Sequence, residues 1–259
     1  MLTEVTGLVL RSVNLGEADR LITLYTKEQG IVSTMVKGAR SFKNKNMATT
    51  QQFTYGSFIL HYKGDKSWVS ESSVIESFFG LRDDIAALSL AGYVVEVLSD
   101  VGTTEPDEDL LRLCLNTLYA ISEKKYPHKK IKATFEIRLA SLIGFMPDIL
   151  ACRDCGERAG EFIFDIMSGN IQCFACHRSA VREHRDESFD ERETRVINIL
   201  TEGAKIALGY CVYAPIERIF AYNISEGDME ILSMATEEYM LNQLGRSYRS
   251  LEFYKEVTD

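Results

Sequence analysis

The chain has 259 residues, of which 46% are apolar, and a formal net charge of −9. This length holds one large domain or two to three small ones, and the composition is typical of a globular protein. No stretch reaches the roughly 18 apolar residues that a membrane span needs, and the N-terminus carries no basic region or cleavage pattern of a secretory signal. We therefore expect a cytoplasmic protein that does not act in a membrane.

Charge is distributed unevenly along the chain. Residues 1–80 carry nine basic and seven acidic side chains, whereas residues 81–259 carry 20 and 31. No carboxylate occurs between Gln29 and Gly64, and the basic residues of this segment are Lys37, Arg40, Lys43, Lys45 and Lys63. A second basic stretch runs from residue 124 to residue 132. Each stretch is either an ordinary solvated surface or a binding site for an anion such as nucleic acid.

Residues 1–80 predict a small β-barrel. Segments rich in β-branched and aromatic residues predict five strands, at 5–13, 20–26, 31–36, 53–62 and 68–78. Five short strands separated by turn residues are typical of the OB-fold, a small closed barrel. Leu8 and Leu10 lie on the opposite face from Val9, so we expect the outer face of the barrel to be partly covered by a second domain.

From Arg82 onward the apolar period becomes helical. One stripe ends near Gly102, a second helix follows an acidic start at Asp107, and a third ends at Gly144. Residues 189–208 predict a further helix, and the last begins at Ser225 as N-cap. We thus predict an α+β fold, with an OB-fold barrel at 1–80, a helical domain in two parts at 81–150 and 181–259, and an inserted cysteine element at 151–180.

Four cysteines, with the spacing C-x2-C-x17-C-x2-C, lie within this inserted element; they are Cys152, Cys155, Cys173 and Cys176. Two close pairs at this separation are typical of a structural zinc site with four thiolate ligands and no open position for substrate. Two disulfides or a redox pair would use the same cysteines, but a reducing compartment and the second pair favour one metal ion. His177 is an alternative fourth ligand, and Cys114 and Cys211 are expected to be buried thiols.

No catalytic motif supports an enzyme. The sequence has no Walker A loop, no G-x-G-x-x-G and no G-x-S-x-G, and its four histidines occur singly. Single-strand binders instead combine basic grooves with aromatic side chains on which bases stack. The candidate DNA-binding residues of the barrel are Lys37, Arg40, Phe42, Lys43 and Lys45, whereas most other barrel aromatics are expected in the core.

Four segments resemble the bacterial recombination-mediator family RecO. They are residues 7–40, the segment GFMPDILACRDCG at 144–156, the segment CFACH at 173–177, and the segment LGRSYRSLEF at 244–253. Their order and spacing cover essentially the whole chain. The resemblance implies an OB-fold, a helical domain, a zinc element, binding of single- and double-stranded DNA, and strand annealing. It also implies contact with the acidic C-terminal tail of the single-strand-binding protein SSB, and with RecR in loading RecA onto SSB-coated DNA in the nucleoid.

Residue by residue, the resemblance places Lys37, Arg40, Lys43 and Lys45 in the DNA-facing region and matches the four cysteines to the zinc ligands. For the acidic SSB tail, or as a second basic patch, the candidate residues are Lys129, Lys130, Lys132 and Arg138. The leading hypothesis is a DNA-binding and annealing mediator. The alternatives are a protein adaptor with little DNA contact, which the charge of −9 favours, and an OB-fold enzyme subunit.

Overall fold

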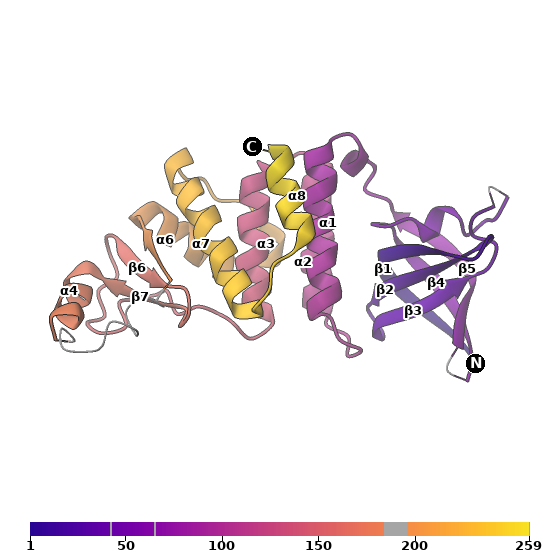
Figure 1. Cartoon of the computed structure of the whole chain (residues 1–259), viewed down its shortest axis with the longest axis horizontal. Coiled ribbons are helices and arrows are strands. Elements are labelled where there is room, and N and C mark those ends of the chain that lie inside the picture. The colour runs from indigo at the N-terminus through magenta and orange to yellow at the C-terminus, as the bar shows by residue number, and fades with distance from the viewer. Residues whose placement is uncertain (42, 65, 184–195, 259) are drawn as a thin grey trace. The chain divides into compact units, whose positions relative to one another are not determined.

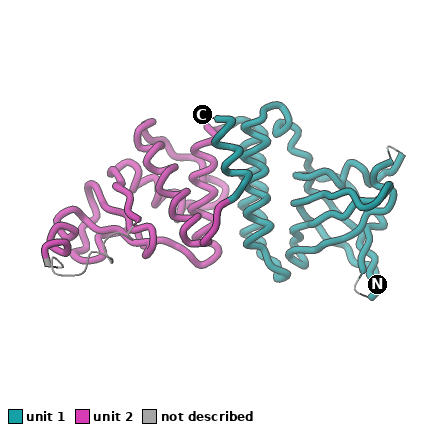
Figure 2. The backbone as a smooth tube through the Cα atoms, viewed as in Figure 1, with its two compact units in different colours: residues 1–125, 248–259 teal, residues 126–247 magenta. Residues whose placement is uncertain are grey.

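Figure 1 shows the computed structural model of the protein, which describes residues 1–41, 43–64, 66–183 and 196–258. The backbone divides into two compact units, coloured separately in Figure 2. The first comprises residues 1–125 and 248–259, and the second comprises residues 126–247. The domain limits that the sequence suggests, at residues 80, 150 and 180, stay predictions.

The first unit begins with a closed five-stranded barrel. Its strands are β1 (Leu2–Leu15), β2 (Asp19–Thr26), β3 (Gly30–Val36), β4 (Tyr55–Lys63) and β5 (Lys66–Glu76), in the order β1-β2-β3-β5-β4. Neighbouring strands are antiparallel except β3 and β5, which close the barrel through a parallel contact. The barrel core consists of Val5, Val9, Ile22, Leu24, Val36, Ala39, Phe58, Leu60 and Val69. The predicted fold class, a five-stranded barrel followed by a helical region, is confirmed.

Part of the outer barrel face is covered, by elements of the same compact unit. Both leucines are almost completely buried. The backbone N–H of Ile31 donates to the carbonyl of Thr103 at 2.8 Å, so the loop after the first helix lies against β3. Gly30 adopts a positive φ of 59°, and a Cβ there would overlap the Thr103 carbonyl. Only glycine fits this close backbone approach.

The helices of the first unit are α1 (Ile85–Val101), α2 (Glu108–Ser122) and α8 (Arg249–Thr258), with the short 3-10 turn η2 (Phe79–Arg82) before α1. Asp84 and Asp107 cap α1 and α2 by accepting hydrogen bonds from backbone N–H groups. The sequence did not predict α8. It packs on α1, where Tyr248 donates a hydrogen bond of 2.8 Å to Asp100.

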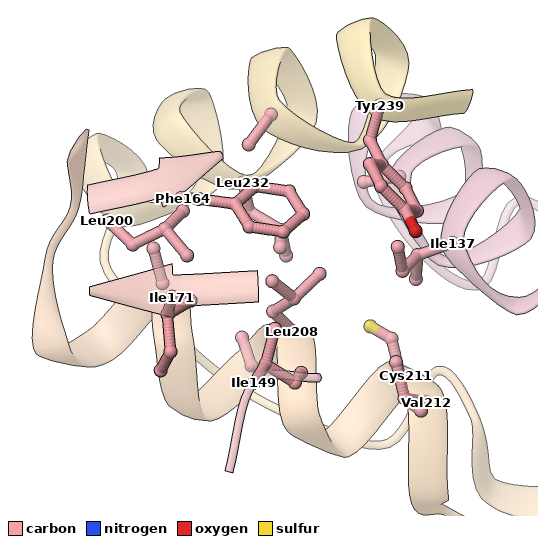
Figure 3. Packing of buried hydrophobic residues seen from close by; sticks show 14 of the residues in the cluster. Ile137, Ile149, Phe164, Ile171, Leu200, Leu208, Cys211, Val212, Leu232 and Tyr239 are labelled. Atoms are coloured by element: carbon pink, nitrogen blue, oxygen red, sulfur yellow. The ribbon is translucent and has the colours of Figure 1, made fainter. Parts of the chain in front are cut away.

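The second unit packs helices on a small sheet. The helices are α3 (His128–Leu142), α4 (Phe174–Glu183), α6 (Glu202–Tyr213) and α7 (Glu226–Leu244), with a 3-10 turn η3 (Ile216–Arg218). The strands β6 (Phe162–Asp165), β7 (Asn170–Cys173) and β8 (Ile197–Leu200) form a sheet in the order β7-β6-β8. Figure 3 shows the shared core, in which the ring of Phe164 from β6 lies 5.2 Å from that of Tyr239 on α7.

The predicted helix at 189–208 is wrong in its middle. Residues 197–200 form β8, which pairs with β6 and buries alternate residues, Asn198 and Leu200. A helix begins only after Thr201, which caps α6 by accepting from the N–H of Ala204 at 3.1 Å. A short apolar run fits either a helix or a strand, and here pairing with a distant strand decides the outcome. Residues 189–195 lie outside the described part of the chain.

Candidate nucleic-acid surface and cysteine cluster

The four cysteines with paired spacing converge in the second unit. Their sulfur atoms all lie within 4.8 Å of one another, and the Sγ atoms of Cys155 and Cys173 are 3.7 Å apart. A tetrahedral zinc ion with Zn–S bonds of about 2.3 Å places its sulfurs about 3.8 Å apart. The donor type and the spacing therefore fit a four-thiolate metal site, and the cluster is close enough to hold one ion.

Two local structures bring these cysteines together. The first pair sits in a turn where the N–H of Gly156 donates to the carbonyl of Cys152 at 2.9 Å. The second pair spans the junction of β7 and α4, with Cys173 ending the strand and Cys176 in the first helical turn. The hairpin between β6 and β7 turns at Gly169, where an added Cβ would lie 2.5 Å from the hydroxyl of Tyr239.

The backbone around the sulfurs favours thiolate ligands. Burial raises the pKa of Cys152, but N–H donors from Cys173, Cys155 and Asp154 outweigh it and lower the pKa to about 6. The pKa of Cys176 is raised because its thiol is hydrogen-bonded to the sulfurs of Cys155 and Cys173. Four adjacent thiolates repel one another, so ionisation of all four requires a cation between them.

The structure also shows the positions of the other residues considered in the sequence analysis, His177, Cys114 and Cys211. His177 points its Nδ1 at the side-chain oxygen of Gln172, 2.9 Å away, and is not among the clustered donor residues. Cys114 and Cys211 are fully buried, as expected for core thiols. Cys152 belongs to the apolar core of the second unit, whereas Cys155 is exposed. The cluster thus joins the surface turn to the core of the unit.

Four of the five basic residues of the first stretch lie on the loop after β3, whereas Lys63 ends β4. Lys37, Arg40, Lys43 and Lys45 are all exposed. Arg40 donates to the carbonyl of Gly16 at 2.9 Å, and Lys45 forms an exposed ion pair of 3.1 Å with Glu71 of β5. The fifth predicted residue, Phe42, lies outside the described residues. The four cations therefore share one short surface loop at the end of the barrel.

Hydrogen bonds hold this loop against the barrel. The side chain of Asn44 donates to the carbonyl of Lys37 at 2.8 Å, and its oxygen accepts from the N–H of Asn46 at 2.8 Å. Asn46 is buried and accepts from Ser72 of β5 at 2.9 Å. A loop with such internal partners presents its charges with less loss of conformational freedom on binding than an unattached one.

The second set of basic residues is divided by the fold. Lys132 is buried and forms ion pairs with Glu136, at 3.0 Å, and with Glu237 of α7, at 2.7 Å. Arg138 is half-buried and donates to backbone carbonyls of Cys211 and Val212. These two side chains hold α3 to α6 and α7. Lys132 therefore lies in the interior of the second unit, and Arg138 is engaged by the backbone of α6.

Lys129 and Lys130 instead line a surface cavity of 470 Å³. Lys129 is exposed and pairs with Glu230, whereas the ammonium of Lys130 donates to the carbonyl of Tyr222. Burial lowers the pKa of Lys130. The apolar part of the wall comes from Pro127, Ile224 and Met229, and the N-terminal turn of α7 lines another part. The cavity thus combines cationic and apolar groups with two carboxylates, those of Glu226 and Glu230.

Comparison with known proteins decides the family. The profile described as Recombination protein O N terminal matches residues 1–78, and that described as Recombination protein O C terminal matches residues 82–252. The chain belongs to the RecO family of DNA repair proteins. Within this RecO-family protein, the N-terminal match covers the barrel and the C-terminal match covers most of the helical region and the cysteine cluster.

Individual relatives agree with this assignment. A DNA repair protein RecO from Acetivibrio thermocellus is 33% identical over 255 residues, covering 97% of this chain and 96% of the relative. One from Alkaliphilus metalliredigens is 29% identical, covering 99% of this chain and all of the relative. One from Bacillus subtilis is 31% identical over 178 residues, which is 68% of this chain and 69% of the relative. No helix in the described part of this RecO-family protein is long and apolar enough to span a membrane.

Proposed function

We propose that this protein is a non-enzymatic mediator that binds single- and double-stranded DNA and anneals complementary strands. In this proposal it acts on SSB-coated DNA with RecR and so assists the loading of RecA in the bacterial nucleoid. The observation that carries the proposal is the exposed basic loop at the end of a closed barrel, in a segment that has no carboxylate from Gln29 to Gly64. Phosphates are bound by such exposed cations through counterion release.

The DNA-binding surface in this proposal is the loop of Lys37, Arg40, Lys43 and Lys45. If each neutralises one phosphate, the logarithm of the affinity for single strands falls with the logarithm of salt at a slope of about −3. Phe42 belongs to the same proposed surface on sequence grounds alone. The four cysteines would hold one zinc ion, whose contribution is to fold the second unit rather than to take part in a reaction.

The test is annealing of complementary SSB-coated oligonucleotides across a salt series, with bare DNA in parallel. The variant replaces all four loop cations with alanine, and it should lose binding and annealing while keeping its fold. A control with the same charge change replaces exposed arginines outside the barrel, namely Arg158, Arg178, Arg182 and Arg249. Equal losses in both variants would trace binding to net charge. Retained affinity of the loop variant would move the site to the stretch at 124–132.

The cavity beside α7 is our proposed site for the SSB tail. An acidic peptide that ends in a carboxylate would meet Lys129 and Lys130 and lay apolar side chains on Ile224 and Met229. Lys129 must then exchange its partner Glu230 for the peptide. Fluorescence anisotropy of a labelled tail peptide tests this proposal: Lys129→Ala should weaken binding, whereas Glu230→Gln, which frees the lysine, should strengthen it. Unchanged affinity in both variants would refute the site.

The adaptor function remains the second candidate, because the same cavity and the net charge of −9 favour a protein partner over DNA. Assays on the same purified protein distinguish the adaptor function from the mediator function. Binding of the tail peptide or RecR without salt-sensitive DNA binding would favour the adaptor, and annealing of coated strands would favour the mediator.

A further inference from the structure

The outer face of the barrel carries an aromatic stack next to the basic loop. Trp68 of β5 and His61 of β4 are cross-strand partners, and their rings stack with centroids 4.3 Å apart and an interplanar angle of 21°. Trp68 is the chain's single tryptophan. Strand alternation fixes the direction of both side chains, because their neighbours Val69 and Leu60 belong to the barrel core. The stack therefore faces outward.

Lys37 connects this stack to the loop. Its ammonium group lies 5.2 Å from the centroid of the Trp68 ring. Lys37 is exposed and has no ion pair among the described residues. A cation–π contact at an exposed site is weak, so little holds the lysine over the ring. It can leave the indole when a stronger partner for its charge, such as a phosphate, is present.

A pair of lysines lies on the other side of the stack, at the turn between β4 and β5. Lys63 and Lys66 face each other across the turn between β4 and β5, two residues from the stacked rings in each strand, and both are exposed. Cations thus lie on both sides of Trp68 along the strand direction: Lys37 follows Met35, the β3 partner of Trp68, whereas Lys66 precedes Trp68 on β5. An aromatic ring between two cationic positions suits a single strand of DNA, because the cations can hold its phosphates while one base stacks on the ring.

Most other aromatic side chains of the barrel are buried or hydrogen-bonded elsewhere. Tyr25 and Phe58 are almost completely buried. Tyr62 packs against the barrel core and donates to Gln29 at 2.7 Å. Phe53 is 6% exposed and adopts a positive φ of 70°. Tyr55 of β4 is half-buried like Trp68, but among these described barrel aromatics Trp68 has an exposed ammonium, that of Lys37, over its ring.

We propose that Trp68, backed by His61, is the stacking platform for one base of a bound single strand, and that Lys37 moves from the ring to a phosphate when the base arrives. This inference rests on the proposed DNA-binding function. It adds a selectivity that the basic loop lacks, because phosphates are present in single and double strands alike. Bases of a duplex are already stacked and cannot lie on the indole, so the platform favours single strands.

The experiment combines two independent readouts on the full chain. Tryptophan fluorescence reports on Trp68 alone, and anisotropy of a labelled oligothymidylate reports on binding without using the tryptophan. We expect saturating oligothymidylate to quench the fluorescence, and Trp68→Ala to weaken single-strand binding roughly tenfold to a hundredfold. Duplex binding should change less than threefold. Trp68→Phe, which keeps an aromatic face, should retain most of the affinity.

The control is Ile75→Ala, which truncates another exposed side chain of β5, 56% exposed, and should leave both affinities unchanged. Trp68→Phe keeps the test valid even if the alanine variant misfolds. If stacking is the cause of binding, this variant must bind single strands with most of the original affinity. Salt-sensitive single-strand binding with unchanged fluorescence, or with full affinity in Trp68→Ala, would overturn the platform and leave the proposed function intact. Absence of any salt-sensitive binding by the unaltered protein would overturn both.

Discussion

Substitution of Cys155 distinguishes a metal ligand from an ordinary surface thiol. Cys155 is exposed, so its side chain contributes little packing, and replacement of such a residue usually changes stability by less than about 0.5 kcal/mol. As one of four ligands it would contribute far more. Apparent binding free energies of structural zinc are about 10–16 kcal/mol, so an even division among four ligands gives roughly 3 kcal/mol for each. We therefore predict that Cys155→Ser destabilises the second unit by about this amount.

Because the cysteine cluster is part of the core of the second unit, we expect loss of a ligand to destabilise the whole unit. Cys152 is buried with Phe162 and Phe164, and Cys173 and Cys176 pack against the same cluster. Losing the ion would free the turn and the hairpin that carry these sulfurs. A loss of 3 kcal/mol in a unit of this size lowers the Tm by roughly 10 °C.

The assay is thermal unfolding by circular dichroism, with zinc content measured on the same samples and thiols kept reduced. Wild type and Cys155→Ser are compared with bound metal and after chelation. The difference between them should be large with metal and should nearly vanish without it. Ser179→Ala, an exposed substitution on α4, serves as the matched control. An equal Tm for wild type and Cys155→Ser with reduced thiols, or an equal loss before and after chelation, would refute the metal-site reasoning.

Three further predictions follow from other parts of the structure. Lys132→Met should lower the free energy of unfolding by about 3–5 kcal/mol in urea, because the buried carboxylate of Glu136 loses the cation that balances its charge; no destabilisation would contradict the ion-pair assignment. Gly30→Ala should lower the free energy of unfolding by at least about 2 kcal/mol, because the new Cβ is strained at positive φ and overlaps the backbone of Thr103. Unchanged stability would contradict this close approach of the two backbone segments. Lys43→Ala should make the slope of log DNA affinity against log salt shallower by about 0.7. Lys45→Ala should change this slope by less, because Lys45 must first leave its ion pair with Glu71. Anisotropy in a NaCl series measures both slopes, and a larger effect of Lys45 would contradict this order.

The Lys132 cluster also has a predicted pH dependence. Burial lowers the pKa of Lys132, but Glu136 and Glu237 outweigh burial and raise it above the ordinary value. A lysine whose pKa is higher in the folded state contributes stability that is complete at neutral pH and is lost as the pH rises through that folded pKa. We therefore expect the stability difference between wild type and Lys132→Met to shrink only at strongly alkaline pH. A difference that already disappears near pH 8 would contradict the assignment.

Several features of the fold could be predicted because their signals are local. The caps Asp107 and Ser225 each satisfy an N–H group within three residues, and the sequence marks them directly. The last long helix ends at Gly245, which adopts the left-handed conformation expected of a C-terminal glycine. The cysteine spacing likewise predicted a cluster, because each close pair is organised by a single turn or helix start.

Other features depend on partners far away in the chain. Residues 197–200 became a strand because β6, more than thirty residues earlier, offers a pairing edge. The lysines of α3 look alike in the sequence, yet Lys132 is buried by a partner on α7, about a hundred residues later, whereas Lys129 stays exposed. No local pattern distinguishes them, since both belong to the same basic stretch.

A basic, acid-free barrel segment, capped helices and two close cysteine pairs can be read from the amino-acid sequence, because these properties depend on composition and on neighbours within a turn or two. Which cations remain at the surface and which aromatic ring faces outward depends instead on how distant segments pack. Exposure is a property of packing: the parallel closure of β3 on β5 at Met35 and Trp68 sets the register that places the tryptophan beside Lys37. A shift of one residue in that register would have turned the ring into the barrel core.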